Sequence, residues 1–141
     1  MTNSTRDRAR TLGLNHVNLV VADVDRSARF YTRALGLEIA AVTQEITFLT
    51  TPGTGDQLAL QLAGGPLDRA TGKSRTAGDS GGVDHIGFDV TDAATLETLV
   101  KLAEAEGGTL LMQLPGENGL PTAFVADPDG YIVQLTARSA A

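Results

Sequence analysis

The sequence predicts an α+β protein made of two tandem βαβββ halves. The main observation is a stretch that occurs twice, at residues 14–38 and again at residues 83–108. Each copy opens with an alternating apolar strand pattern whose third residue is a histidine, His16 or His85, and the chain has no other histidine. An aspartate, an amphipathic helix pattern and a glycine break follow in the same order. The two histidines are 69 residues apart (85 − 16), about half the chain, which indicates duplication of one supersecondary unit.

The composition is that of an ordinary globular protein. A chain of 141 residues is long enough to bury a core as a single domain. The net charge of −6 argues against a nucleic-acid-binding surface, and no apolar run is long enough to span a bilayer or to act as a signal segment. The absence of cysteine excludes disulfides and thiolate catalysis and fits a cytoplasmic protein. We therefore expect no nucleic-acid or membrane partner.

The first half is expected over residues 14–63, after a disordered polar leader at residues 1–12. Its opening strand turns one apolar set toward a covering helix: Val17, Leu19 and Val21. The other set faces inward, toward a cavity: His16, Asn18, Val20 and Ala22. Asp23 or Asp25 can cap the helix that follows, and Gly36 can end it. Three more strands are expected near residues 37–42, 46–51 and 57–63, and Gln61 lies on the inner face of the last one.

The second half repeats this order over residues 83–137, so that one domain spans residues 13–137. Its inner set is His85, Gly87 and Asp89, and a helix with an apolar stripe begins after Asp92. Strands are expected near residues 109–113, 122–126 and 131–136, and the motif Asp127-Pro128-Asp129-Gly130 forms the turn before the last strand. Residues 64–82 are rich in glycine, serine and threonine and lack a hydrophobic period, which predicts a flexible linker.

Four inner-face residues and two neighbours are candidates for a site, each with a structural alternative. The paired placement of His16 and His85 favours a shared role in lining a ligand cavity, although two half-buried histidines bonded to neighbours would also fit the pattern. Gln61 and Gln134 are either ligands of a bound group or amide partners of these histidines. Two further polar residues share the inner faces and are candidates for ligand contacts: Asn18 and Asp89.

Three stretches of the chain resemble the vicinal oxygen chelate superfamily, the group of glyoxalase I, bleomycin-resistance proteins and extradiol dioxygenases. They are "LNHVNLVVADVDRSARFYTRALGLE", "VDHIGFDVTD" and "FVADPDGYIVQL", and together they extend from Leu14 to Thr136. The resemblance implies a curved, half-open mixed sheet, the glyoxalase-like cup, with a small-molecule cavity inside it and assembly as a homodimer.

The resemblance also implies a divalent metal site. In metal-dependent members the ligands come from the first and fourth strands of each half, which by position are His16, Gln61, His85 and Gln134. Metal-using relatives typically carry glutamate at the position of Gln134. A neutral amide there removes a charge–charge attraction, which lowers metal affinity by a net amount of about a few kcal/mol. An amide also cannot act as a general base near neutral pH.

Two functions of different classes follow from these residues. The first is a small-molecule-binding protein, of the kind that sequesters an antibiotic, which is metal-free or binds metal weakly because Gln134 replaces the glutamate. The second is a metal-dependent lyase, isomerase or dioxygenase that acts on a small oxygenated substrate. The sequence assigns no catalytic residue, and a fold that has lost catalysis is a third alternative.

Overall fold

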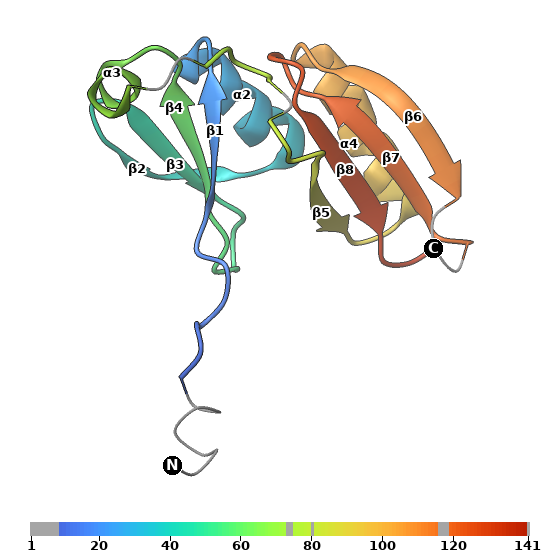
Figure 1. Cartoon of the computed structure of the whole chain (residues 1–141). Helices are drawn as coiled ribbons and strands as arrows, with labels where there is room; N and C mark the ends of the chain where they lie inside the picture. Colours follow the sequence, from blue (N-terminus) through green and yellow to red (C-terminus); the bar gives the residue numbers. More distant parts are fainter. Residues whose placement is uncertain (1–8, 73–74, 80, 116–118, 141) are drawn as a thin grey trace.

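The computed structural model describes residues 9–72, 75–79, 81–115 and 119–140 of the chain. It contains two separate four-stranded mixed sheets, one from each half, with helices packed between and behind them (Figure 1). Both sheets are open, and the described strands of one half do not pair with those of the other. The predicted α+β class with two βαβββ halves is confirmed. The leader up to residue 8 lies outside the described residues, and residues 9–16 contain no helix or strand.

The first half is built from β1 (Val17–Val21), α2 (Val24–Leu35), β2 (Glu38–Val42), β3 (Ile46–Thr50) and β4 (Leu58–Leu62). Its strands lie in the order β1-β4-β3-β2. β1 and β4 run parallel, and the other neighbours are antiparallel. This order brings the opening strand directly beside the fourth strand. The sequence predicted a histidine as the third residue of each opening strand, but His16 and His85 each lie just before the strand begins.

The second half repeats the arrangement with β5 (Ile86–Val90), α4 (Ala93–Ala105), β6 (Thr109–Pro115), β7 (Pro121–Ala126) and β8 (Ile132–Ala137). The strand order is β5-β8-β7-β6, again with a parallel pair between the first and fourth strands of the half. The repeat extends to an irregularity, because β2 and β6 each show a register shift, between Ile39 and Ala41 and between Leu110 and Met112.

The helix boundaries follow from capping residues that the sequence already indicated. Asp23 accepts a hydrogen bond from the backbone N–H of Arg26, and Asp92 accepts one from Thr95. Gly36 ends α2 in the left-handed conformation, with a φ of 78° that an L residue rarely adopts. Of the two predicted caps for the first helix, Asp23 is the one that the structure uses.

The two halves share one hydrophobic core through their helices. α2 packs against α4, and buried side chains of both belong to a single cluster, among them Phe30 and Leu96. A Cβ at Gly108 would lie 2.7 Å from a ring carbon of Phe30 and 2.7 Å from the carbonyl oxygen of Ala126. Glycine is therefore required at this position for the halves to approach so closely.

Hydrogen bonds from the turn between β7 and β8 join the halves further. The buried Tyr31 hydroxyl donates to the carboxylate of Asp127 at 2.7 Å. Asp129 accepts hydrogen bonds from the Arg26 guanidinium, at 2.7 Å, and from the Ser27 hydroxyl, at 3.1 Å. Burial raises the pKa of Asp127, and burial together with Asp127 raises the pKa of Tyr31 well above its usual value. The turn aspartates therefore dock the second half on the first helix.

The linker between the halves differs from the expectation of a flexible segment. It contains a short helix, α3 (Pro66–Thr71), which begins with proline and ends at Gly72 in the left-handed conformation. The helix carries no apolar stripe that sequence periodicity could detect, because the side chain it buries is the carboxylate Asp68. No helix in the described part of the chain has the length and apolar character needed to cross a membrane.

Candidate functional site

His85 and Gln134 lie together on the inner face of the second half. The side-chain oxygen of Gln134 is 3.0 Å from His85 Nε2, and its Nε2 donates to the hydroxyl of Thr122 at 3.0 Å. Thr122 in turn bonds to the carbonyl oxygen of Leu135. On the other side of the ring, His85 Nδ1 is 2.6 Å from a carboxylate oxygen of Asp84. Both ring nitrogens of His85 and both polar atoms of the Gln134 amide therefore have partners within the half.

His16 has a different environment, although it directly precedes the first strand of its half, as His85 does in the other half. Its Nδ1 is 2.6 Å from the side-chain oxygen of Asn15, its neighbour in sequence. In the described part of the chain, no hydrogen bond joins His16 to the fourth strand of its half. The two histidines share an Nδ1 contact with the side chain of the preceding residue, Asn15 or Asp84, and an aromatic neighbour on the third strand, described below.

The strand register explains the difference between the histidines. Asn18 lies opposite Ala59 in the first half, and Gly87 lies opposite Gln134 in the second half. Because Asn18 and Gly87 each follow their histidine by two residues, Ala59 is the structural counterpart of Gln134. Gln61 lies two residues further along the strand and corresponds to Thr136.

Gln61 belongs to a buried polar network on the inner face of the first half. Its side chain is 4% exposed, and its oxygen accepts a hydrogen bond from Asn18 Nδ2 at 2.8 Å. Its Nε2 donates to Asp68 of α3 at 3.2 Å. Asp68 also accepts a hydrogen bond of 2.5 Å from the guanidinium of Arg75. The network therefore runs from β1 through β4 and α3 to the linker.

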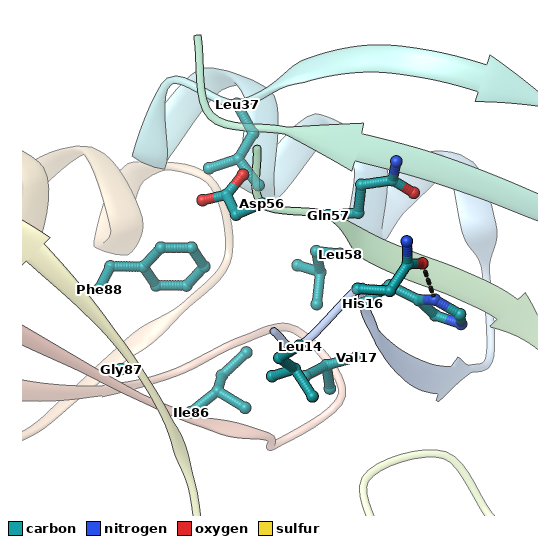
Figure 2. A pocket seen from close by; sticks show the side chains of 11 residues that line it. Leu14, His16, Val17, Leu37, Asp56, Gln57, Leu58, Ile86, Gly87 and Phe88 are labelled. Atoms are coloured by element: carbon teal, nitrogen blue, oxygen red, sulfur yellow. Dashed lines mark hydrogen bonds between the residues drawn. The ribbon is translucent and has the colours of Figure 1, made fainter. Parts of the chain in front are cut away.

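A small cavity of about 170 Å³ is lined by the start of β1, the segment that leads into β4, and β5. Figure 2 shows apolar side chains from both halves around it, with Phe88 at one end and His16 at the other. Asp56 and Gln57 add polar groups at its edge. The remaining side chains that line it are Leu14, Asn15, Val17, Leu37, Leu58 and Ile86.

A larger cavity of about 330 Å³ lies between β1, the linker and the start of β5. It is the place where predicted site residues of the two halves come together, because Asn18 of the first half and His85 of the second both line it. Arg75 and Tyr131 line it as well. The Tyr131 hydroxyl donates to the carbonyl oxygen of Val20 at 2.6 Å, and burial raises its pKa, so the phenol is protonated at neutral pH.

Asp89, the second predicted ligand contact, lies away from both cavities. Its side chain is 68% exposed and its carboxylate is 3.7 Å from the Arg138 guanidinium. The structure also adds two residues that the sequence did not single out. Phe48 and Phe124 contact His16 and His85 edge to face, with ring centroids 6.0 and 5.4 Å apart. Their alternation with the core residues of β3 and β7 is the signal that could have placed them on the inner faces.

The four predicted metal ligands do not form one group within the chain. His16 lines the small cavity, Gln61 is bonded to Asn18 and Asp68, and Gln134 is bonded to His85. Among the residues that the structure describes, no three histidine, cysteine or acidic side chains are grouped so that they could hold a metal ion. Both amides are engaged in hydrogen bonds to neighbouring side chains, and neither carries the charge that a carboxylate ligand would supply.

The fold and the cavities define a duplicated βαβββ protein with space for a small molecule between its halves. The chain belongs to the Glyoxalase/Bleomycin resistance protein/Dioxygenase superfamily, whose sequence profile matches residues 13–135.

Two curated relatives are similar to the chain over most of their length. The chain is 30% identical over 127 residues to a "Probable lactoylglutathione lyase" of Vibrio parahaemolyticus, which covers 85% of this chain and 86% of that protein. It is 32% identical over 133 residues to an "Ethylmalonyl-CoA/methylmalonyl-CoA epimerase" of Cereibacter sphaeroides, which covers 86% of this chain and 95% of that protein.

Solved structures share the fold at lower sequence identity. A glyoxalase-related enzyme from Fulvimarina pelagi has a TM-score of 0.71 at 24% identity, covering 91% of this chain and 89% of that one. A glyoxalase/bleomycin resistance protein/dioxygenase family enzyme from Burkholderia phytofirmans has a TM-score of 0.72 at 19% identity, covering 87% and 96%.

Proposed function

We propose that the protein binds a small molecule in the larger cavity and does so without a tightly held metal ion. The observation that carries the proposal is the meeting of Asn18 and His85, one from each half, on the wall of a cavity of about 330 Å³. A concave space with a few converging polar groups is the usual form of a small-molecule site. The neutral amides Gln61 and Gln134 support the metal-free part, because both are engaged in hydrogen bonds to neighbouring side chains.

The proposal is tested by measuring metal content and ligand binding on the same preparation. We expect less than stoichiometric divalent metal by elemental analysis. In a fragment screen by NMR, we expect shifts centred on residues of the larger cavity. His85→Ala should weaken the fragments that bind there, whereas His16→Ala, a matched change at the corresponding position of the first half, should not. Stoichiometric metal that both histidine variants abolish would contradict the proposal.

A second candidate is a metal-dependent lyase or isomerase, with dioxygenase chemistry as a further alternative in the superfamily. The names of the two curated relatives, a lyase and an epimerase, favour this candidate. It requires that His16, Gln61, His85 and Gln134 hold an ion despite their separate hydrogen bonds. Gln134→Glu distinguishes the candidates, because an added carboxylate beside His85 should raise metal affinity only where the other donors can reach the same ion.

We also propose that the protein forms a homodimer. The support is a set of exposed apolar side chains on the second strand of each half, an edge strand in both sheets: Ile39, Val42, Leu111, Met112 and Leu114. Covering such an edge removes surface that otherwise invites aggregation. Sedimentation velocity at micromolar concentration should give a dimer, and a monomer under these conditions would refute this part.

A further inference from the structure

We propose that Asp68 is a positioning residue that sets the hydrogen-bonding polarity of the larger cavity. As a result the cavity takes a small carboxylate that carries an adjacent hydrogen-bond donor, such as a 2-hydroxy acid. The inference rests on the proposed function, since it names the ligand class of that cavity. It follows from the network of Asn18, Gln61, Asp68 and Arg75.

Asp68 is a carboxylate with 1% of its surface exposed on a helix of the linker. One of its oxygens accepts hydrogen bonds from Gln61 Nε2 at 3.2 Å and from Arg75 at 2.5 Å. The other oxygen accepts from the backbone N–H of Gly64 at 2.9 Å. A buried charge is costly unless it is paired and hydrogen-bonded, and these donors meet that requirement.

The carboxylate fixes which way two neighbouring amides face. An ionised carboxylate can only accept, so Gln61 must turn its NH₂ group toward Asp68. The Gln61 oxygen then faces Asn18, which must in turn direct its own NH₂ group toward Gln61. This leaves the Asn18 side-chain oxygen as the acceptor on the cavity wall. The orientation of both amides is therefore a consequence of the buried charge.

Arg75 supplies hydrogen-bond donors on the same wall of the cavity. Its guanidinium has five N–H donors, and one of its nitrogens contacts Asp68. The Arg75 side chain is 39% exposed and lines the cavity together with Asn18. Asp68 thus holds a cationic donor and a neutral acceptor through one network. A ligand complementary to this pair has an anionic oxygen for Arg75 and a donor for Asn18.

The other polar groups on the wall have partners of their own. Asp84 contacts the ring of His85, and Asp79 accepts a hydrogen bond from the backbone N–H of Thr76. Both carboxylates repel an anionic ligand. The ion pair with Asp68 also weakens the electrostatic attraction between Arg75 and an anion. We therefore expect modest affinity, with selectivity that arises from the paired donor and acceptor.

Three matched probes test the ligand class by NMR titration. Mandelate carries both groups, phenylacetate lacks the hydroxyl, and mandelamide lacks the charge. We expect mandelate to bind about tenfold or more tightly than either of the others, because phenylacetate loses the hydrogen bond to Asn18 and mandelamide loses the charge that pairs with Arg75. Equal binding of all three would overturn the inference.

Two variants test the role of Asp68. Asp68→Asn allows the side-chain amides of Gln61 and Asn18 to turn over, so mandelate and phenylacetate should then bind about equally. A purely structural role of Asp68 would leave the preference for mandelate unchanged. Gln61→Met breaks the chain without altering Asp68, should have the same effect, and decides the question if Asp68→Asn does not fold. Asp25→Asn, an exposed change on α2, is the control. A preference retained in the folded variants would refute the positioning role.

The same titrations separate this inference from the proposed function. If uncharged probes shift cavity resonances and mandelate has no advantage, the cavity binds small molecules but the ligand class is wrong. If no probe or screened fragment shifts resonances of the cavity, both the proposed function and the inference fail.

Discussion

On the second half, Gln134 lies beside the first strand and contacts His85, whereas the corresponding position of the first half holds Ala59. The first half instead buries Gln61, two residues further along, against a carboxylate from the linker. The strand order, the parallel pair, the register shift in the second strand and the aspartate cap are the same in both halves.

The two halves therefore share the same backbone arrangement but differ in the polar side chains of their inner faces. The first face is closed by a buried polar network that depends on α3. The second face has a half-exposed histidine and amide with partners inside its own sheet. Variants that act on one face and spare the other can therefore measure the difference directly.

The largest effect is expected from Asp68→Ala. The change leaves Gln61 Nε2 and the Gly64 N–H without their acceptor, and it unpairs Arg75. We expect a loss of about 3 kcal/mol in the free energy of unfolding, at the lower end for a broken buried pair because Arg75 is partly exposed. Urea denaturation measures it. Asp84→Ala, whose side chain is 87% exposed, should cost less than about 0.5 kcal/mol, and equal costs would remove the contrast.

Tyr31→Phe tests the contact that the halves make with each other. Losing a buried hydrogen bond to a carboxylate should cost about 2 kcal/mol at neutral pH. The pKa of Asp127 is already raised, so its folded form binds the proton more tightly and stability falls as pH rises above about 3.8. Without the tyrosine donor that pKa rises further. The deficit against the parent protein should therefore be larger at pH 7 than at pH 3.5, and a constant deficit would contradict this account.

Replacing the two amides gives a direct comparison of the faces. Gln61→Leu removes two hydrogen bonds from a fully buried site and should cost about 1.5 kcal/mol. Gln134→Leu alters a half-buried site and should cost about 0.5 kcal/mol. Thermal unfolding of the two variants in parallel checks the ranking, and the reverse order would show that the second face is the more tightly built.

The smallest effect concerns a feature that the halves share. The hydrogen bonds from Thr95 lower the pKa of Asp92. This cap therefore stabilises the fold fully at pH values above the usual aspartate pKa of 3.8, and its contribution is lost as the pH falls through the lowered pKa. Asp92→Asn should therefore flatten the acid limb of the stability curve slightly. Urea midpoints at pH 7 and pH 2.5 test this. Asp25→Asn is the control, because it changes an aspartate in the first turn of the other helix and leaves the cap of that helix, Asp23, in place.

Much of the fold could be predicted because its signals are local. Alternation identified the strands, and the caps Asp23, Asp92 and Gly36 marked the helices. The counterpart of Gln134 could not be identified in this way, because a slide of two residues leaves every side chain on the same face. Alternation therefore does not distinguish Ala59 from Gln61, and only the pairing register does.

The sequence did not predict the linker helix, α3, for a different reason. A helix of six residues has little stability of its own, and α3 depends on the tertiary contacts of Asp68. The candidate site was partly predictable, since Asn18 and His85 line the larger cavity. Arg75 and Asp68 were not identified, because they lie in a stretch whose composition resembles a spacer.

The docking of the Asp127–Gly130 turn on α2 has a consequence for synthesis on the ribosome. The hydrogen-bond partner of Tyr31, Asp127, lies 96 residues later in the chain. The partner of the Ala22 backbone N–H, Asp129, lies 107 residues later. The first half therefore emerges long before the groups that complete its helix, which predicts slow, late closure rather than stepwise folding of two independent units. Pulse proteolysis of stalled nascent chains should find the first half protease-sensitive until the last hairpin has left the exit tunnel.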